Sequence, residues 1–360
     1  MLFIKVDDLK PGMRLGKPIY NKNGVLLYDR DTKLTLQAIY GIKNFNLMGL
    51  YILEPAEPVP PLTEDDINFE RFQTMSVFSI REDLDLIAAG KKDKGLDWLC
   101  SLIIKNYGSL GRKINFVQSL RSEEDFVYKH VLNVAILTAL IAGEMGITGA
   151  RMNMLVKAAI LHDIGALEHK QVFEENELDH DQRKVIWNST QEILGKYSAL
   201  DVDITRLINQ MQELYVEEGG NLSENLRSNP NANILYIADS FDRMTAMKSY
   251  EEPTSEVLAV RTMLENEERY NPPITNSLVK AINILYPGVC VELTDGEKGL
   301  VIRENPDNIF KPLVLNFRDN SFCDLDDPDV YSKVQIADVM KTMDNRIKLD
   351  HSLLETYGQQ

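Results

Sequence analysis

The sequence has few cysteines, and the three that it has, Cys100, Cys290 and Cys323, lie far apart along the chain. They do not form the closely spaced pairs that are typical of structural zinc sites. The sequence therefore predicts packed thiols in a reducing compartment rather than a disulfide framework.

Positive charge is also scarce, because 55 acidic residues outnumber 39 lysines and arginines and leave a formal charge of −16. A surface this acidic repels the phosphate backbone of nucleic-acid polymers and the anionic surface of membranes. We therefore expect neither of them as a partner. A small phosphate ligand is still compatible with the sequence, because one bound metal ion can reverse the local field.

Long hydrophobic runs are missing as well. The longest run, from Val131 to Gly143, contains Asn133 and is too short to span the roughly 30 Å hydrocarbon core of a bilayer. The first residues, MLFIKVDDLK, reach acidic residues at once and lack the pattern of a secretory signal. The sequence predicts a cytoplasmic protein.

Regions of different periodicity follow one another along the 360 residues. Residues 1–55 alternate short strand patterns with an Asn-Gly turn and one helical pattern, which predicts a small α+β module. Residues 56–66 are rich in proline and acidic residues, as in a linker. Residues 67–287 repeat apolar residues at helical spacing, whereas residues 288–360 return to short strand patterns.

The predicted fold class is therefore mainly α. A helical bundle domain is flanked by the small N-terminal α+β module and by a small β-rich C-terminal module. The last part of the C-terminal module, around residues 335–349, is predicted to be helical.

Four side chains that could hold a metal interrupt apolar stretches of the helical region. His130 opens an apolar helix, His162 and Asp163 end another, and Asp239 lies within the apolar run ILYIADSFDRM. A buried carboxylate without a partner is costly, and one metal ion would partner all four groups together. Two imidazoles and two carboxylates form a mixed nitrogen and oxygen ligand set that suits Fe, Mn, Mg or Zn.

Each of these residues also has a simpler interpretation. A His-Asp pair at a helix end is mostly a capping feature, and a lone histidine such as His130 is usually a hydrogen-bonded core residue. Asp239 could pair with Arg243, four residues later on the same helix. The conjunction of four such groups in one domain favours a metal site, and the sequence leaves open whether one divalent metal is bound or none.

The order His130, His162–Asp163, Asp239 resembles the H…HD…D signature of the HD superfamily of metal-dependent phosphohydrolases. More narrowly, LVKAAILHDIGA and ILYIADSFDRMTAMKSY resemble the HD-GYP subfamily, as do the flanking segments IKVDDLKPGMRLGKPIYNKNGVLL and NILYPGVCVELTDGEKGLVI. The resemblance implies a bacterial signalling protein that hydrolyses cyclic di-GMP with two or three metals bridged by hydroxide. In an active protein, Asp163 would hold the ion and orient the attacking water.

Several positions depart from the subfamily pattern. Ala166 stands where a lysine would face phosphate, and Asn188 stands where a ligand histidine is expected. Gln210 and Met211, or Met211 and Gln212, take the place of a His-His pair. The tyrosine and proline that give the subfamily its name are also missing. These losses remove the second metal, without which a bridging hydroxide cannot form.

Two functional hypotheses follow. The preferred one is a signalling protein of the cyclic-di-GMP type with a degenerate, catalytically weak or inactive site that keeps at most one metal. It would sense a cyclic dinucleotide or nucleotide, or pair with a signalling protein or a second copy of itself. The alternative is an active single-metal HD phosphohydrolase that acts on cyclic di-GMP or another nucleotide.

Overall fold

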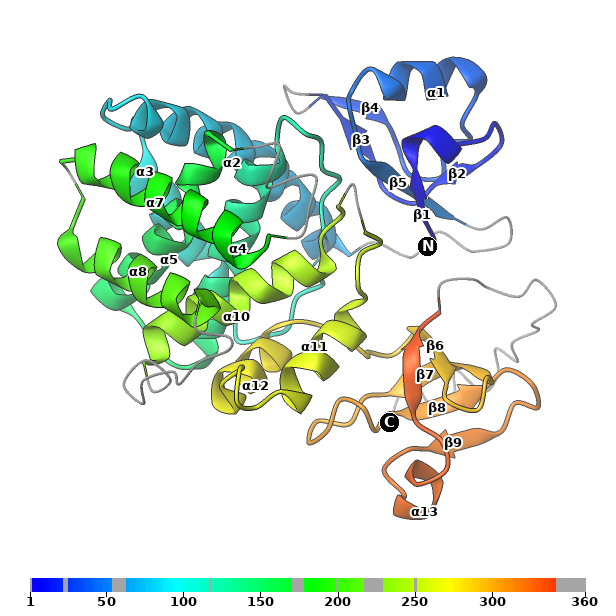
Figure 1. Ribbon diagram of the computed structural model, residues 1–360. Coiled ribbons are helices and arrows are strands. Elements are labelled where there is room, and N and C mark those ends of the chain that lie inside the picture. The colour runs from blue at the N-terminus through cyan, green and yellow to red at the C-terminus, as the bar shows by residue number, and fades with distance from the viewer. Residues whose placement is uncertain are drawn as a thin grey trace.

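The computed structural model describes residues 2–21, 25–53, 63–116, 118–169, 178–198, 200–216, 229–248 and 251–340. A bundle of helices lies beside two small modules, one at each end of the chain (Figure 1). This arrangement confirms the predicted fold class. The predicted domain limits stay predictions, and most of the predicted linker lies outside the described residues.

The N-terminal module combines short strands with one helix. Its elements are β1 (Leu2–Lys5), η1 (Val6–Asp8), β2 (Arg14–Leu15), β3 (Ile19–Tyr20), β4 (Leu26–Tyr28), α1 (Leu36–Lys43) and β5 (Gly49–Leu53). Strands β1, β5 and β2 form an antiparallel sheet, and β3 pairs with β4. Thr35 caps α1, whose Ile39 and Ile42 share a buried cluster with Leu50 of the sheet. The predicted Asn-Gly turn at residues 23–24 lies outside the described residues.

The helical region begins earlier than predicted. Thr63 accepts a hydrogen bond from the Asp66 amide and the Asp66 side chain accepts one from the Thr63 amide, which is a capping box. Residues 64–66 of the predicted linker therefore form the first turn of a helix. The helices are α2 (Glu64–Ala88), α3 (Leu96–Tyr107), α4 (Phe126–Glu144), α5 (Gly149–Leu161), η2 (Ile164–Leu167), α7 (His180–Lys196), α8 (Val202–Val216), α10 (Pro230–Thr245), α11 (Glu256–Glu265) and α12 (Pro272–Ala281).

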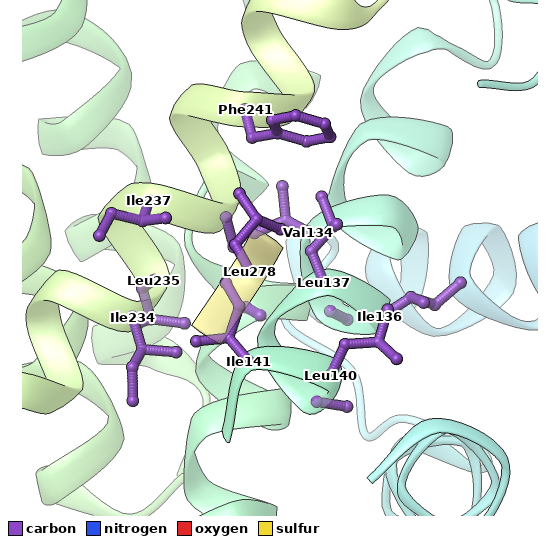
Figure 2. Packing of buried hydrophobic residues seen from close by; sticks show 14 of the residues in the cluster. Val134, Ile136, Leu137, Leu140, Ile141, Ile234, Leu235, Ile237, Phe241 and Leu278 are labelled. Atoms are coloured by element: carbon purple, nitrogen blue, oxygen red, sulfur yellow. The ribbon is translucent and has the colours of Figure 1, made fainter. Parts of the chain in front are cut away.

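Helix α4 is the centre of the bundle. It packs against α2, α3, α5, α10 and α12, so it is apolar on nearly every side. Figure 2 shows Val134, Leu137 and Ile141 of α4 in the same packed cluster as Ile234 of α10 and Leu278 of α12. Within the described ranges, α4 alone is long and apolar enough to cross a membrane, and 89% of its apolar window is buried inside the protein. Burial in the bundle accounts for its composition.

The C-terminal module is a five-stranded antiparallel sheet in the order β10-β6-β7-β8-β9. Its elements are β6 (Cys290–Leu293), β7 (Lys298–Arg303), β8 (Leu313–Asn316), β9 (Phe322–Asp324), α13 (Pro328–Tyr331) and β10 (Ile336–Val339). The predicted helix around residues 335–349 is wrong over its described part, because Ile336–Val339 form strand β10. Ile336 pairs with Leu293 at the edge of the sheet, and Arg261 of α11 donates hydrogen bonds to the carbonyls of Ile336 and Ala337. Residues 341–349 of that prediction lie outside the described residues.

The N-terminal module docks on the segment that precedes α4. The ammonium of Lys17 donates a hydrogen bond of 2.6 Å to the carbonyl of Gln118, and the Met48 amide donates to the carbonyl of Arg121. Leu120 and Met247 complete the module's buried cluster. Gln118 and Arg121 also form hydrogen bonds with Asp242, so the N-terminal module contacts a segment that takes part in the candidate metal centre.

Candidate metal centre

Three helices bring the four predicted ligands to one point inside the bundle. His130 comes from α4, His162 and Asp163 from the end of α5, and Asp239 from α10. All four are buried, and one ligand atom from each lies within 4.8 Å of the others. The Nε2 atoms of His130 and His162 lie 2.8 and 3.1 Å from Oδ1 of Asp239. The donor chemistry and this spacing fit a divalent ion.

The end of α5 orients its histidine toward this point. Helix α5 ends at Leu161, and Nδ1 of His162 lies 2.7 Å from the carbonyl oxygen of Ala159 in the last turn. A hydrogen bond from Nδ1 to that carbonyl leaves Nε2 to face the two aspartates. Histidines that bind metals use the same arrangement to fix the ring and its tautomer.

The glycine that follows the His-Asp pair lets η2 pack against α7. A Cβ atom on Gly165 would lie 2.4 Å from the carbonyl oxygen of Ile186 and 2.5 Å from the amide nitrogen of Thr190. The Gly165 amide instead donates a hydrogen bond of 3.0 Å to Oγ1 of Thr190. The close approach fixes the turn that carries Asp163.

A third aspartate supports the site from behind, and the sequence reasoning missed it. Oδ2 of Asp242 lies 2.7 Å from Nδ1 of His130, and both of its oxygens accept hydrogen bonds from Nη2 of Arg121 at 2.7 and 2.8 Å. Asn133 and Gln118 each donate a further bond to Oδ1. The one sequence signal for this residue was its place three positions after Asp239 in an apolar run.

Arg243 makes a contact with Asp163 that the sequence did not predict, in addition to the predicted alternative of a pairing with Asp239. Nε of Arg243 donates a hydrogen bond of 2.8 Å to Oδ2 of Asp239, and its Nη2 donates to Oδ2 of Asp163. The Tyr215 hydroxyl also donates to Oδ2 of Asp239. One guanidinium therefore holds both of the candidate metal-binding carboxylates.

The electrostatics of the cluster keep its carboxylates ionised. Burial raises the pKa of Asp163, but the neighbouring His162 and Arg243 outweigh it and hold that pKa below its usual range. Asp239 and Asp242 have lowered pKa values for the same reason, with Arg243 and Arg121 as their main charge partners. For His130, burial and Arg243 lower the pKa, whereas hydrogen bonds to the three aspartates raise it to about 9.

The chain is similar in sequence to a known protein family and to a characterised relative. Residues 127–244, which include all four candidate ligands, match the family model of the HD domain. The chain contains an HD domain. Over 206 residues it is 23% identical to the cyclic di-GMP phosphodiesterase PA4108 of Pseudomonas aeruginosa, in an alignment that covers 55% of this chain and 49% of that protein. The chain thus spans about half the length of this curated relative.

A solved structure also resembles the chain. It is Bd1817, described as an HDG"Y"P protein from Bdellovibrio bacteriovorus. The superposition has a TM-score of 0.45 and 14% sequence identity, and it covers 77% of this chain and 97% of that structure.

Of the positions predicted to have lost a ligand in this HD domain, three do not belong to the buried cluster. Asn188 is exposed on α7, and Gln210 accepts a hydrogen bond of 2.8 Å from the side chain of Asn229. Met211 is fully buried in the hydrophobic core of the bundle. The structure therefore does not add these side chains to the four candidate ligands.

The other two positions lie next to the site. Ala166 is fully buried in a small apolar cluster with Phe126, Val127 and Ile186, where a lysine ammonium would have no water. Gln212, the alternative register of the His-His pair, is buried with its Nε2 3.4 Å from Oδ1 of Asp163. An amide that donates to a ligand carboxylate supports it but does not replace a second metal ligand.

A cavity lies near the HD cluster but does not contain it. Its volume is about 470 Å³, and it opens between the N-terminal module and helices α2 and α4, with Lys17, Glu70, Arg81 and Lys129 in its lining. The four candidate ligands are absent from that lining. Gln118 lines the cavity and also donates a hydrogen bond to Asp242, which in turn contacts Nδ1 of His130. One side chain therefore connects the cavity with the residues behind the candidate metal centre.

Proposed function

We propose that this HD domain is a signalling module that binds a cyclic dinucleotide or nucleotide and hydrolyses cyclic di-GMP weakly or not at all. The proposal is carried by the types of residue at and around the four candidate ligands. Within the described ranges one group of three or more metal-type side chains is found, and it is the HD set. Met211 and Ala166, at positions that would serve a second ion or its phosphate, are apolar and fully buried.

The expected chemistry follows from the number of cations. Where one divalent metal binds, His130, His162, Asp163 and Asp239 would hold it, and it would polarise a phosphoryl oxygen and acidify a bound water. A second cation would share the charge that develops on the transferring phosphoryl group. When no second cation neutralises part of this negative charge, the free-energy barrier to hydrolysis is higher, although a phosphate ligand can still bind.

Cyclic di-GMP is the first substrate to test, because the relative PA4108 is by its name a cyclic di-GMP phosphodiesterase. We expect turnover by the wild-type protein with Mn²⁺ or Fe²⁺ to stay within about tenfold of the turnover of an Asp163→Asn variant. Asparagine keeps the size of the side chain and removes the charge that would hold the ion. Turnover at least about tenfold above that variant would contradict the proposal, since a rate ratio of that size is a real difference in transition-state stabilisation.

The active single-metal phosphohydrolase is the second candidate, and a specific observation favours it. The HD set is complete, and the hydrogen bond of His162 to the Ala159 carbonyl orients the ring as in a working site. The same assay separates the two candidates if it also includes linear dinucleotides and mononucleotides. A rate that requires both Asp163 and added metal would identify an enzyme.

The remaining expectations stay predictions. They are a cytoplasmic location, a signalling protein as partner, a homodimer, and the identity of the metal among Fe, Mn, Mg and Zn. The acidic charge of −16 supports the expectation that nucleic-acid polymers and membranes are not partners.

A further inference from the structure

We infer that Arg243 is a built-in cation of the HD site, whose guanidinium binds both candidate metal-ligating aspartates and competes with a divalent ion for them. The inference deepens the proposed function, because it concerns the same four residues. It does not depend on turnover, and its test measures metal binding and stability instead.

Arg243 binds the oxygen of Asp163 that a metal ion would also bind. Oδ2 of Asp163 is the oxygen near the imidazoles, at 3.6 Å from Nε2 of His130 and 3.5 Å from Nε2 of His162. The same Oδ2 accepts the hydrogen bond from Nη2 of Arg243. An ion held by the two imidazoles and Asp163 would therefore bind an oxygen that is already engaged by a positive charge.

The shape of the Arg243 side chain suits a bridge between two carboxylates. A guanidinium is planar and presents several N–H donors in a fixed fork, so it can bind two carboxylates at once. Arg243 uses Nε for Asp239 and Nη2 for Asp163. Because Asp239 and Arg243 are four residues apart on α10, one helix presents both groups to the end of α5. The bridge joins these two helices in the way that a shared metal would.

The net charge of the buried network also sets Arg243 against a divalent ion. Among the described residues its hydrogen-bonded core holds the carboxylates of Asp163, Asp239 and Asp242 and the guanidiniums of Arg121 and Arg243. A histidine nitrogen must be free of its proton to bind a metal, so both imidazoles are neutral in the metal-bound state. The carboxylates and guanidiniums then sum to −1, and a divalent ion raises the sum to +1. Without Arg243 the sum is −2, which a divalent ion neutralises. Uncompensated buried charge is unfavourable, so Arg243 opposes metal binding.

Arg243 is more accessible to solvent than the two aspartates that it binds. The side chain of Arg243 keeps 20% of its surface exposed, whereas Asp163 and Asp239 keep 3% and none. The guanidinium therefore lies at the outer edge of the cluster. It can rotate toward solvent to admit an ion without unfolding the helix that carries it, which makes Arg243 a competitor rather than a permanent block.

The test compares Mn²⁺ binding by calorimetric titration in the wild type and in three full-length variants. Arg243→Gln removes the charge and keeps a donor, Arg243→Met removes both, and Arg243→Lys keeps the charge. We expect the Gln and Met variants to bind Mn²⁺ at least about tenfold more tightly than the wild type, because a like charge next to the ion has been removed. The Lys variant should stay close to the wild type. Arg206→Met, which loses an exposed arginine paired with Asp203, is the matched control and should bind as the wild type does.

Thermal unfolding gives a second readout. EDTA should leave the unfolding midpoint of the wild type unchanged and should lower that of the Gln and Met variants, and Mn²⁺ should restore it. If the Met variant folds only with Mn²⁺, that result also supports the inference. Equal Mn²⁺ affinity in the wild type and the Gln variant would overturn it. Hydrolysis of cyclic di-GMP by the wild type at least about tenfold above the Asp163→Asn variant would refute the proposed function and would leave this comparison of affinities standing.

Discussion

At the scale of single residues, the site is a network of buried charges in which each carboxylate has a cationic partner. Asp242 is the clearest case, because it and Arg121 are both fully buried and joined by two hydrogen bonds. A buried ion pair adds little net stability when intact, but removal of one partner leaves an uncompensated charge. The pair therefore has a large effect on stability only when it is broken.

This pair supplies a prediction about stability. We expect Arg121→Met to lower the free energy of unfolding by about 3–5 kcal/mol, since Asp242 would stay buried beside His130 without its guanidinium. Arg206→Met, at an exposed ion pair, should change it by less than about 1 kcal/mol. Chemical denaturation of both variants measures the difference. Similar losses in the two variants would show that the Arg121 pair is not special.

The four candidate ligands could be predicted from the sequence, whereas their partners could not. His130, His162, Asp163 and Asp239 are polar residues at apolar helical positions, which is a local pattern. Arg121 lies in an irregular segment before α4, where no periodicity indicates which way a side chain points. Arg243 could be paired with Asp239 by helical spacing, but its bond to Asp163 depends on how α5 and α10 pack.

At the scale of elements, the close packing of η2 against α7 positions the end of α5. Gly165→Ala would place a methyl group against the backbone of Ile186 and Thr190, which cannot move as a flexible side chain could. We expect this substitution to lower the free energy of unfolding by about 1–3 kcal/mol, as overpacking does. When it is added to the Arg243→Gln variant, it should also weaken Mn²⁺ binding by that variant, because the same turn carries Asp163.

Gly195 is the matched control for that substitution, because it lies on the exposed side of α7 with no atom within 4 Å of an added Cβ. Gly195→Ala should raise the free energy of unfolding by about 0.5–1 kcal/mol through its better helix propensity. Thermal and chemical denaturation report both effects. Opposite signs for the two glycines are expected, and a destabilising Gly195→Ala would contradict the assignment of the contact to Gly165.

The wrong prediction of a terminal helix has a cause in the tertiary structure. A helix was predicted around residues 335–349, and the structure has strand β10 at Ile336–Val339. The open edge of β6 and the carbonyl contacts of Arg261 outweigh the local pattern.

At the scale of the whole molecule, the HD site depends on a contact between modules. The segment that bears Gln118 and Arg121 supports His130 through Asp242, and the N-terminal module docks on that segment through Lys17 and Met48. The cavity of about 470 Å³ lies at the same junction. Regions of distinct periodicity predicted separate modules, but no local pattern could predict which surface of the bundle the first module covers.

We propose that the described part of the HD domain has a single cation position, which is held by Arg243 or by one metal ion. Equilibrium dialysis of the Arg243→Gln variant against Mn²⁺, with the metal measured by mass spectrometry, tests it most directly. We predict saturation at one ion per chain, with Asp163→Asn in the same background reducing the bound metal to background. Saturation at two ions per chain would contradict the account, because it would require a second set of ligands beyond His130, His162, Asp163 and Asp239.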